Sequence, residues 1–261
     1  MKLTVLVDNN TFIDQYYLGE PALSVYLEED GKKILFDTGY SDVFIKNAEK
    51  MNISLDCLDY LVLSHGHNDH TGGLIYLKDH LQKTVLIAHP DVFLERTDSG
   101  LEVGSPVKLD ELPVHQFIGG KDPFWISPDL CFLGEIKKVT DFENDTVGKL
   151  HDGSNDPLRD DSALAYRTKD GLFIITACSH SGICNICEQA RRIFKEDRIC
   201  GILGGFHLLQ DGSKLDKTIQ YFKENSIREL WPCHCVSLSA KIRMSRVADI
   251  HETGVGLKLD I

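Results

Sequence analysis

The sequence lacks any long apolar run. No window of its 261 residues approaches the roughly 18 apolar residues that a membrane-spanning helix needs, so no membrane segment is expected. The apolar stretch at residues 1–7 is too short for a secretory signal peptide, and the acidic Asp8 follows it. We therefore expect a cytoplasmic protein.

Basic residues are also scarce. The chain carries 28 Lys and Arg against 40 Asp and Glu, which gives a formal net charge of −12 at pH 7. Binding to nucleic acid or to an anionic membrane needs clustered basic residues, so neither partner is expected. A small anionic substrate stays compatible with this charge, because a bound metal ion can outweigh the global field locally. The sequence is also compatible with an oligomer.

Disulfide bonds are not expected in a reducing compartment, although the chain has eight cysteines. Cysteines in such a compartment serve metal binding, redox chemistry or buried packing. Six of them fall in the last third of the chain: Cys178, Cys184, Cys187, Cys200, Cys233 and Cys235.

Short apolar runs alternate with amphipathic segments, and this alternation is typical of an α/β fold. Polar residues that can bind metals follow several of the predicted strands in both halves. We expect one domain over residues 1–261, built as an αβ/βα sandwich of two facing mixed sheets with helices outside. Strands are predicted at residues 23–27, 33–36, 61–63, 85–88, 172–176, 200–203 and 229–231, and helices at about 41–51, 72–81, 186–196, 215–224 and 238–248.

Residues 90–160 have a different composition, with six of the eight prolines and several glycines. A long irregular segment of this kind is usually an insertion that forms a lid or shapes a substrate mouth, and the alternative is a solvated connection. The aromatic residues Phe117, Phe124 and Trp125 either stack on a flat substrate ring or attach the insertion to the core.

Four potential metal ligands lie within six residues: His65, His67, Asp69 and His70. Side chains at i and i+2 of an extended segment point the same way, so His65 and His67 can share one ion. Asp69 and His70 can turn toward a second ion. Imidazole and carboxylate together suit Zn²⁺, Fe or Mn²⁺, and two such ions can activate a water for attack on a phosphoryl or carbonyl group.

Residues 64–73 (Ser-His-Gly-His-Asn-Asp-His-Thr-Gly-Gly) resemble the signature of the metallo-β-lactamase superfamily, and the order of elements is similar to that fold over nearly the whole chain. Residues 36–39 (Phe-Asp-Thr-Gly) resemble the motif that ends the preceding strand in this superfamily. The resemblance implies the fold, a binuclear metal site, and an Asp37 that supports the metal-binding loop.

Three later motifs resemble the subfamily that contains the archaeal dihydropterin–ribofuranosylaminobenzene phosphate synthase. They are residues 177–182 (Ala-Cys-Ser-His-Ser-Gly), residues 204–208 (Gly-Gly-Phe-His-Leu) and the pair His234-Cys235. This resemblance says much less about the substrate than about the fold.

The chain departs from the superfamily at two ligand positions. It lacks the His-Thr-Pro-Gly-like turn that usually supplies the third ligand, and His180 is the best substitute. It also lacks the usual bridging aspartate, where Cys178 is either a thiolate ligand or a small buried residue. For the last ligand we favour His234. His207 is the alternative ligand, or lies near the metals as an acid or substrate-binding group, and either histidine could instead be an ordinary core residue.

Together these features predict a binuclear centre of Zn, Fe or Mn, supported by Asp37 and Cys178, with Asp69 and His207 as candidates for moving protons. The predicted ligands form two sets: His65, His67 and His180 for one ion, and Asp69, His70 and His234 for the other.

A second metal or iron–sulfur site, or a redox pair, could be built from Cys184, Cys187, Cys233 and Cys235 if their loops meet. The alternative is that these cysteines simply pack in the core.

The leading functional hypothesis is a metal-dependent hydrolase of a phosphate ester or similar anionic small molecule. The alternatives are a transferase resembling the pterin synthase and a redox or iron-binding role. The scarcity of basic residues near the motifs, where a second phosphorylated substrate would need them, favours hydrolysis.

Overall fold

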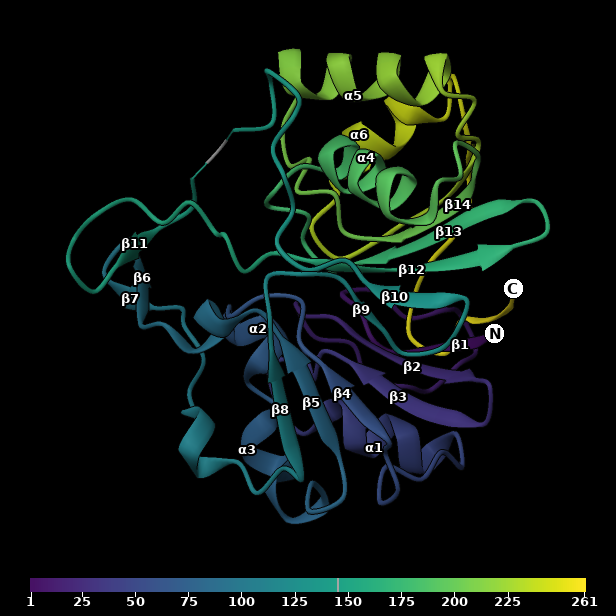
Figure 1. The fold of residues 1–261 in the computed structure, drawn as a ribbon. Helices are drawn as coiled ribbons and strands as arrows, with labels where there is room; N and C mark the ends of the chain where they lie inside the picture. The colour runs from purple at the N-terminus through teal and green to yellow at the C-terminus, as the bar shows by residue number, and fades with distance from the viewer. Residues whose placement is uncertain (145) are drawn as a thin grey trace. The chain divides into compact units, whose positions relative to one another are not determined.

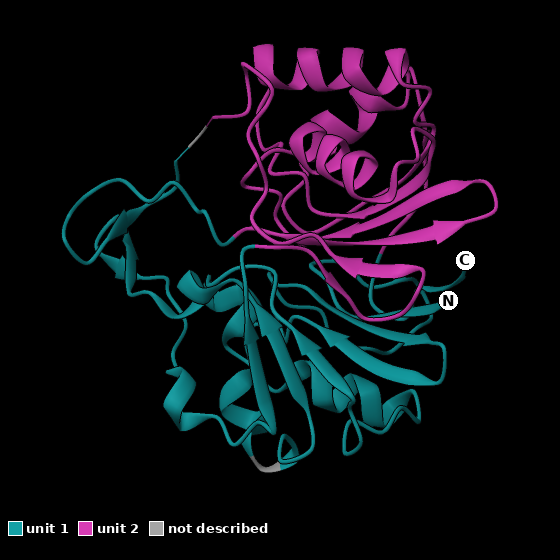
Figure 2. Ribbon diagram, in the orientation of Figure 1, with its two compact units in different colours: residues 1–121, 146–160, 254–261 teal, residues 122–145, 161–253 magenta. Residues whose placement is uncertain are grey.

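The computed structural model of the protein describes residues 1–144 and 146–261, without the side chain at position 79. The chain divides into two compact units (Figure 2). Unit 1 comprises Met1–Lys121, Thr146–Asp160 and Gly254–Ile261, and unit 2 comprises Asp122–Asp145 and Asp161–Thr253. Among the helices of the described ranges, none combines the length and apolar character that crossing a membrane requires.

Unit 1 is built on a mixed sheet. Its strands are β1 (Lys2–Val7), β2 (Ser24–Glu29), β3 (Lys32–Phe36), β4 (Tyr60–Val62), β5 (Val85–Ala88), β8 (Gln116–Gly119) and β17 (Lys258–Asp260). Within the described residues they form seven strands in the order β17-β1-β2-β3-β4-β5-β8. Pairing is antiparallel from β17 to β3 and parallel from β3 to β8.

One row of apolar side chains crosses this sheet and forms the centre of the unit 1 core. Tyr26, Leu35, Leu61 and Leu86 stand opposite one another on neighbouring strands and are all buried. They belong to one cluster with residues of α1 (Val43–Lys50) and α3 (Leu74–Leu77). These two helices lie on one face of the sheet (Figure 1). Because the row anchors each strand, the polar residues that follow β3 and β4 have fixed positions.

Unit 2 repeats this architecture. Its strands are β9 (Phe124–Trp125), β10 (Leu130–Phe132), β12 (Ala163–Thr168), β13 (Gly171–Thr176), β14 (Ile199–Gly204), β15 (Glu229–Pro232) and β16 (Asp249–Ile250). In the described part of the chain the order is β16-β15-β14-β13-β12-β10-β9, parallel from β16 to β13 and antiparallel beyond.

A matching apolar row runs through Ala165, Ile174, Ile202 and Leu230. It belongs to a second core cluster with residues of three helices. These helices lie on one face of the sheet (Figure 1). They are α4 (Ile183–Phe194), α5 (Ser213–Glu224) and α6 (Leu238–Met244). Each βα half predicted from the sequence is thus a compact unit with its own sheet.

The predicted elements are present, with boundaries shifted by a few residues. The helix predicted at 72–81 is interrupted: α3 is followed by a 3₁₀ turn at Lys78–His80. Seven strands of the two large sheets were not predicted, and three of them lie in the segment expected to be irregular: β1, β8, β9, β10, β12, β16 and β17.

Residues 90–160 do not form a single irregular insertion, because they contribute strands to three sheets. They contribute β8 to the sheet of unit 1, and β9 and β10 to the sheet of unit 2. A small sheet of β6 (Arg96–Asp98), β7 (Leu101–Glu102) and β11 (Lys149–Leu150) also falls in this range. The irregular composition reflects short strands separated by turns. The role of this segment in shaping a substrate mouth stays a prediction.

Candidate metal centre

Two ring nitrogens of unit 1 lie at the spacing that a shared ion requires. His65 and His67 follow β4, and His65 Nε2 lies 3.2 Å from His67 Nδ1. Two Zn–N bonds of about 2.0–2.1 Å at a tetrahedral angle place their nitrogens about 3.3 Å apart. Burial lowers the pKa of His67 to about 4, against the opposing influence of Asp69. The ring is therefore neutral at pH 7, which is the form that binds a metal.

His70 is oriented by a buried carboxylate. It lies on α2 (Asn68–Thr71), and its Nδ1 is 2.8 Å from Oδ2 of Asp37. With a carboxylate as acceptor, Nδ1 carries the proton and Nε2 is left as the ligand atom, the arrangement usual for metal-binding histidines. Asp69 Oδ2 lies 3.5 Å from that Nε2, and its side chain keeps 28% exposure. Asp69 and His70 are thus suited to share a second ion.

Asp37 also holds the start of the histidine run. The backbone N–H of Ser64 donates to Oδ1 of Asp37 over 2.8 Å, and the Ser64 hydroxyl donates to Oδ2 over 2.6 Å. The same hydroxyl lies 2.9 Å from His65 Nδ1. Asp37 has a φ of 58°, a conformation that is costly outside glycine and concentrates at functional sites. A single carboxylate thereby connects the residue before His65 with the ring of His70.

The two glycines after the histidine run allow a close approach of backbone. A Cβ at Gly73 would collide with the carbonyl oxygen of Thr38, and one at Gly72 with that of Tyr40. Thr38 in turn donates two hydrogen bonds to the carbonyl of His70, from its N–H over 2.8 Å and from its hydroxyl over 3.0 Å. The turn after β3 and the ligand helix α2 are therefore packed together through main-chain atoms.

The other predicted ligands lie in loops that follow strands of unit 2. His234, after β15, has its Nε2 3.2 Å from Sγ of Cys178. One ligand atom of His180 lies within 4.8 Å of the same sulfur. The rings of His180 and His207 are 4.4 Å apart between centroids. Unit 2 thus brings Cys178, His180, His207 and His234 together.

The loops of unit 2 are strained and tied to one another. His207, His234 and Ser179 all have positive φ values, of 46°, 49° and 57°. The Ser179 hydroxyl donates to the carbonyl of Gly205 over 2.7 Å, and the Gly205 N–H donates to Ala177 over 2.7 Å. Conformations of this kind cost about 1–3 kcal/mol each and persist where the surroundings fix them.

A buried glutamate caps the helix that follows His180. The N–H groups of Cys184 and Asn185 each donate to the carboxylate of Glu143 over 3.0 Å. These are first-turn amides of α4, which otherwise have no partner within the helix. Burial raises the pKa of Glu143, although both hydrogen bonds oppose the shift. The cap fixes where α4 begins, and hence the loop that carries His180.

The cysteine pair of α4 belongs to the core. Cys184 and Cys187 are both fully buried in the main cluster of unit 2, and burial raises the pKa of each thiol. Neither occurs in any group of three or more potential ligands that the described residues form, and neither do Cys233 and Cys235. Cys235 instead accepts a hydrogen bond from the N–H of His207 over 3.3 Å. The packing interpretation therefore fits these cysteines better than a second metal site.

The aromatic residues proposed for a substrate mouth have packing partners. Trp125 lies 4.7 Å from Phe194, between ring centroids. Phe194 is the last residue of α4, whereas His180 precedes the first turn of this helix. At 1.5 Å per residue, the length of α4 separates Phe194 from the His180 end of the helix by roughly 17 Å. Phe117 packs against the unit 1 core. The contact with Phe194 favours the packing alternative for Trp125, because the side chain attaches β9 to α4, and its stacking on a substrate ring stays a prediction.

A cavity of about 430 Å³ in unit 1 adjoins the ligand helix. Asn68 and Gly72 line it on either side of Asp69 and His70, and the half-exposed Tyr40 and Tyr76 line it as well. The rest of the lining is Ile75, Glu95, Arg96, Glu102, Gly104, Ser105 and Pro106. Most of these come from the segment that we expected at the substrate mouth.

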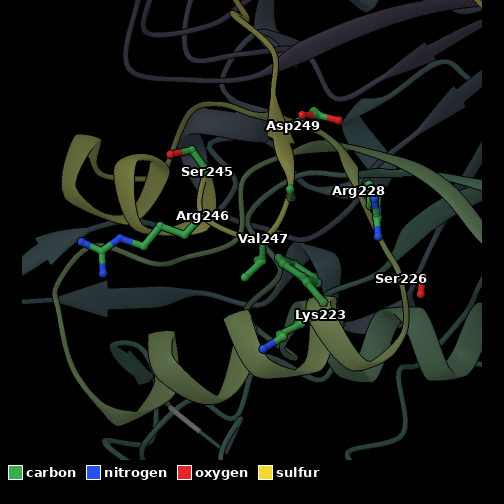
Figure 3. A pocket seen from close by; sticks show the side chains of 9 residues that line it. Lys223, Ser226, Arg228, Ser245, Arg246, Val247 and Asp249 are labelled. Atoms are coloured by element: carbon green, nitrogen blue, oxygen red, sulfur yellow. The ribbon is translucent and has the colours of Figure 1, made fainter.

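A second cavity, in unit 2, is separate from the predicted ligands. It has a volume of about 370 Å³ and is lined by the end of α5 and by residues 245–249. Figure 3 shows Arg228 and Arg246 extending to opposite sides of Val247. Lys223 lies in the last turn of α5 and Arg246 follows the end of α6, where positive charge complements the helix dipole. These basic residues thus have a local structural role.

Several residues that organise the site were not predicted. Arg96 is the largest fully buried side chain of unit 1, with 1% exposure. It forms ion pairs of 2.6 Å with Asp156 and 2.7 Å with Asp160. Asp160 also accepts the N–H of Gly66, between His65 and His67, over 2.8 Å. No spacing in the sequence indicates these contacts.

Comparison with known proteins decides the family. The profile described as the metallo-beta-lactamase superfamily matches residues 18–194. The chain belongs to the metallo-beta-lactamase superfamily. The fold and the resemblance predicted from the sequence are thereby confirmed.

Relatives of this superfamily member match most of its length. The chain is 28% identical to the 7,8-dihydropterin-6-methyl-4-(beta-D-ribofuranosyl)-aminobenzene-5'-phosphate synthase of Methanocaldococcus jannaschii, over 92% of this chain and 89% of that protein. It is 30% identical to the solved structure of Tm1679, described as a metal-dependent hydrolase of the beta-lactamase superfamily, with a TM-score of 0.85 over 100% and 99% of the two chains. The metallo-beta-lactamase fold protein YhfI of Bacillus subtilis shares the fold at 16% identity and a TM-score of 0.61, over 99% and 98% of the two chains.

Proposed function

We propose that the protein is a metal-dependent hydrolase of a phosphate ester or a similar anionic small molecule. The observation that carries this proposal is the donor set at the strand ends of each unit. Unit 1 offers His65 and His67 with nitrogens 3.2 Å apart, and an oriented His70 beside Asp69. Membership of the superfamily, and the similarity to a chain described as a metal-dependent hydrolase, support the same conclusion.

The proposed ligands come from both units. One ion takes His65, His67 and His180, and the second takes Asp69, His70 and His234. Three imidazole or carboxylate donors per ion suit Zn, Fe or Mn. The thiol of Cys178 near His234 adds a soft donor that favours Zn or Fe. Asp37 is not a ligand in this proposal, but its hydrogen bond fixes the orientation of the His70 ring.

Two bound divalent ions would polarise a phosphoryl oxygen and bring the pKa of an attacking water toward neutrality. The chain's own residues supply the remaining steps. Asp69, with its partly exposed carboxylate, accepts a proton from the attacking water. His207, next to His180, gives a proton to the leaving oxygen. The cavity beside α2 holds the organic part of the substrate between Tyr40 and Tyr76.

A synthase reaction is the second candidate. The observation in its favour is the 28% identity to the aminobenzene-phosphate synthase over nearly the full length of both chains. Ions held by the same ligands would neutralise a departing pyrophosphate, so the donor set is compatible with both reactions. The exclusion of water and a second organic pocket would distinguish a condensing enzyme.

Two assays on one preparation separate these candidates. The protein is stripped with a chelator, reconstituted with Zn²⁺ or Mn²⁺, and tested on bis-p-nitrophenyl phosphate. The same preparation is tested for condensation of a dihydropterin pyrophosphate with an aminobenzene ribofuranosyl phosphate. Metal-dependent release of p-nitrophenol without condensation is the expected result. Condensation with negligible phosphodiester turnover would replace the hydrolase by the synthase.

A further inference from the structure

Two consecutive buried aspartates each hold one of the ligand loops. Asp160 accepts the N–H of Gly66, which lies between His65 and His67, over 2.8 Å. Asp161 accepts the N–H of Ser181, which follows His180, also over 2.8 Å. Each contact lies within a single unit, because the division between the units falls between these two residues.

Both carboxylates are costly to bury, and each is retained with hydrogen-bond partners. Asp160 is 1% exposed and Asp161 is 0% exposed. Burying a carboxylate costs several kcal/mol unless charges and hydrogen bonds compensate for it. Arg96 compensates Asp160 by donating to its second oxygen over 2.7 Å. The carboxylates are therefore fixed groups, and each loop amide has a defined anchor.

Gly66 is also confined from the other side. A Cβ at this position would collide with the carbonyl oxygen of Val92 and with the guanidinium of Arg96. The backbone between His65 and His67 is thus pressed against Arg96 while its N–H is held by Asp160. The backbone between the two rings is therefore confined on both sides.

We propose that Asp160 and Asp161 act as a clasp: a pair of positioning residues that fixes the histidine segments of both units to neighbouring points of the chain. Consecutive Cα atoms are 3.80 Å apart across a trans peptide, so anchoring to adjacent residues limits how far the two segments can separate. This inference rests on the proposed function in one respect, namely that both segments ligate the same pair of ions.

An insertion tests the clasp directly. One glycine placed between Asp160 and Asp161 keeps both carboxylates and both anchors, and lengthens only the link. The expected result is a loss of about 10–100-fold in Zn²⁺ affinity by chelator competition, the range for residues that orient metal ligands. The matched control is one glycine between the exposed Lys121 and Asp122, another point where the chain passes between the units. Equal affinity in the two insertion variants would overturn the proposal.

Amide hydrogen exchange in the metal-free protein separates failure of the clasp from failure of the proposed function. Asp161→Asn should speed exchange at Gly66 as well as at Ser181, and Asp160→Asn should speed exchange at Ser181 as well as at Gly66. Asn is a neutral and weaker acceptor than Asp, which loosens each anchor, but it keeps a carbonyl oxygen, so we expect the fold to be retained. The control is Asp156→Asn, which also removes a carboxylate from Arg96 but touches neither loop amide.

If each variant affects only its own amide, the two aspartates are independent local anchors and the clasp is refuted, whether or not the protein binds metal. If exchange spreads across both loops while no variant alters metal affinity, the clasp holds only the fold and its role in the metal centre is refuted.

Discussion

The carboxylate of Asp37 makes three contacts, two with Ser64 just before the histidine run and one with His70 within it. It accepts from the N–H and the hydroxyl of Ser64 and orients the ring of His70. Replacing Asp37 by Ala should therefore lower Zn²⁺ affinity about 10–100-fold, because residues that orient metal ligands contribute at this level. Chelator competition measures the change.

The matched control for Asp37 is Asp59→Ala. Asp59 also accepts a backbone N–H, from Lys33, but at the opposite end of β3. If both variants retain wild-type affinity, Asp37 does not support the metal centre.

Tyr76 offers a test of the cavity beside α2. Its side chain is 50% exposed and lines the cavity without a core position to maintain. Tyr76→Ala should raise KM severalfold and leave kcat and thermal stability close to wild type, because it removes binding common to the ground and transition states. Tyr16→Ala, a more exposed tyrosine outside the cavity, is the control. Unchanged KM for an aromatic phosphodiester would remove this cavity from the substrate site.

At the scale of elements, the sequence predicts what is local. The histidine run could be recognised because its four ligands lie within six residues at the end of an apolar strand. Seven strands of the two sheets could be predicted because each contains a short apolar run that is largely buried. The role of Asp37 followed only from the resemblance to the superfamily.

The anchors of the ligand loops could not be predicted in this way. Gly66 and Asp160 are 94 positions apart, and Arg96 and Asp160 are 64 apart. Such pairs are set by the tertiary fold and leave no periodic pattern in the sequence. For Trp125 the sequence left ligand stacking and packing both open, and only the structure shows its packing contact with Phe194.

The cap of α4 predicts a dependence of stability on pH. Burial raises the pKa of Glu143 above its ordinary value of 4.5, so the folded protein binds this proton more tightly than the unfolded chain does. Between pH 4.5 and the raised pKa the folded state therefore holds more protons, and this group's contribution to stability falls as pH rises.

The comparison is between wild type and Glu143→Gln in chemical unfolding from pH 4 to 7. Gln keeps one acceptor for the helix amides and does not titrate. The free energy of unfolding of wild type should decline relative to the variant as pH rises above 4.5. A difference that is constant, or that grows in favour of wild type, would show that Glu143 does not titrate as described.

At the scale of the whole molecule, the proposed ligands come from two units with separate cores. Metal binding should therefore stabilise the protein against unfolding, by about 4 kcal/mol at a free metal concentration 1,000 times Kd. His180→Ala and His67→Ala each remove a proposed ligand of the same ion and should reduce the rise in melting temperature on adding Zn²⁺. The exposed His151, with no place in either ligand set, is the control position. A full rise in His180→Ala would remove unit 2 from that ion.

The proposed function depends on a binuclear centre in which Asp69 is a ligand of the second ion. Elemental analysis of protein reconstituted with Zn²⁺ or Mn²⁺ and freed of excess metal tests this most directly, on wild type, Asp69→Ala and the surface control Asp152→Ala. We expect two equivalents in wild type and in the control, and one equivalent with loss of phosphodiester turnover in Asp69→Ala. A wild type that retains at most one equivalent, or an Asp69→Ala variant that retains the full metal content, would contradict this expectation.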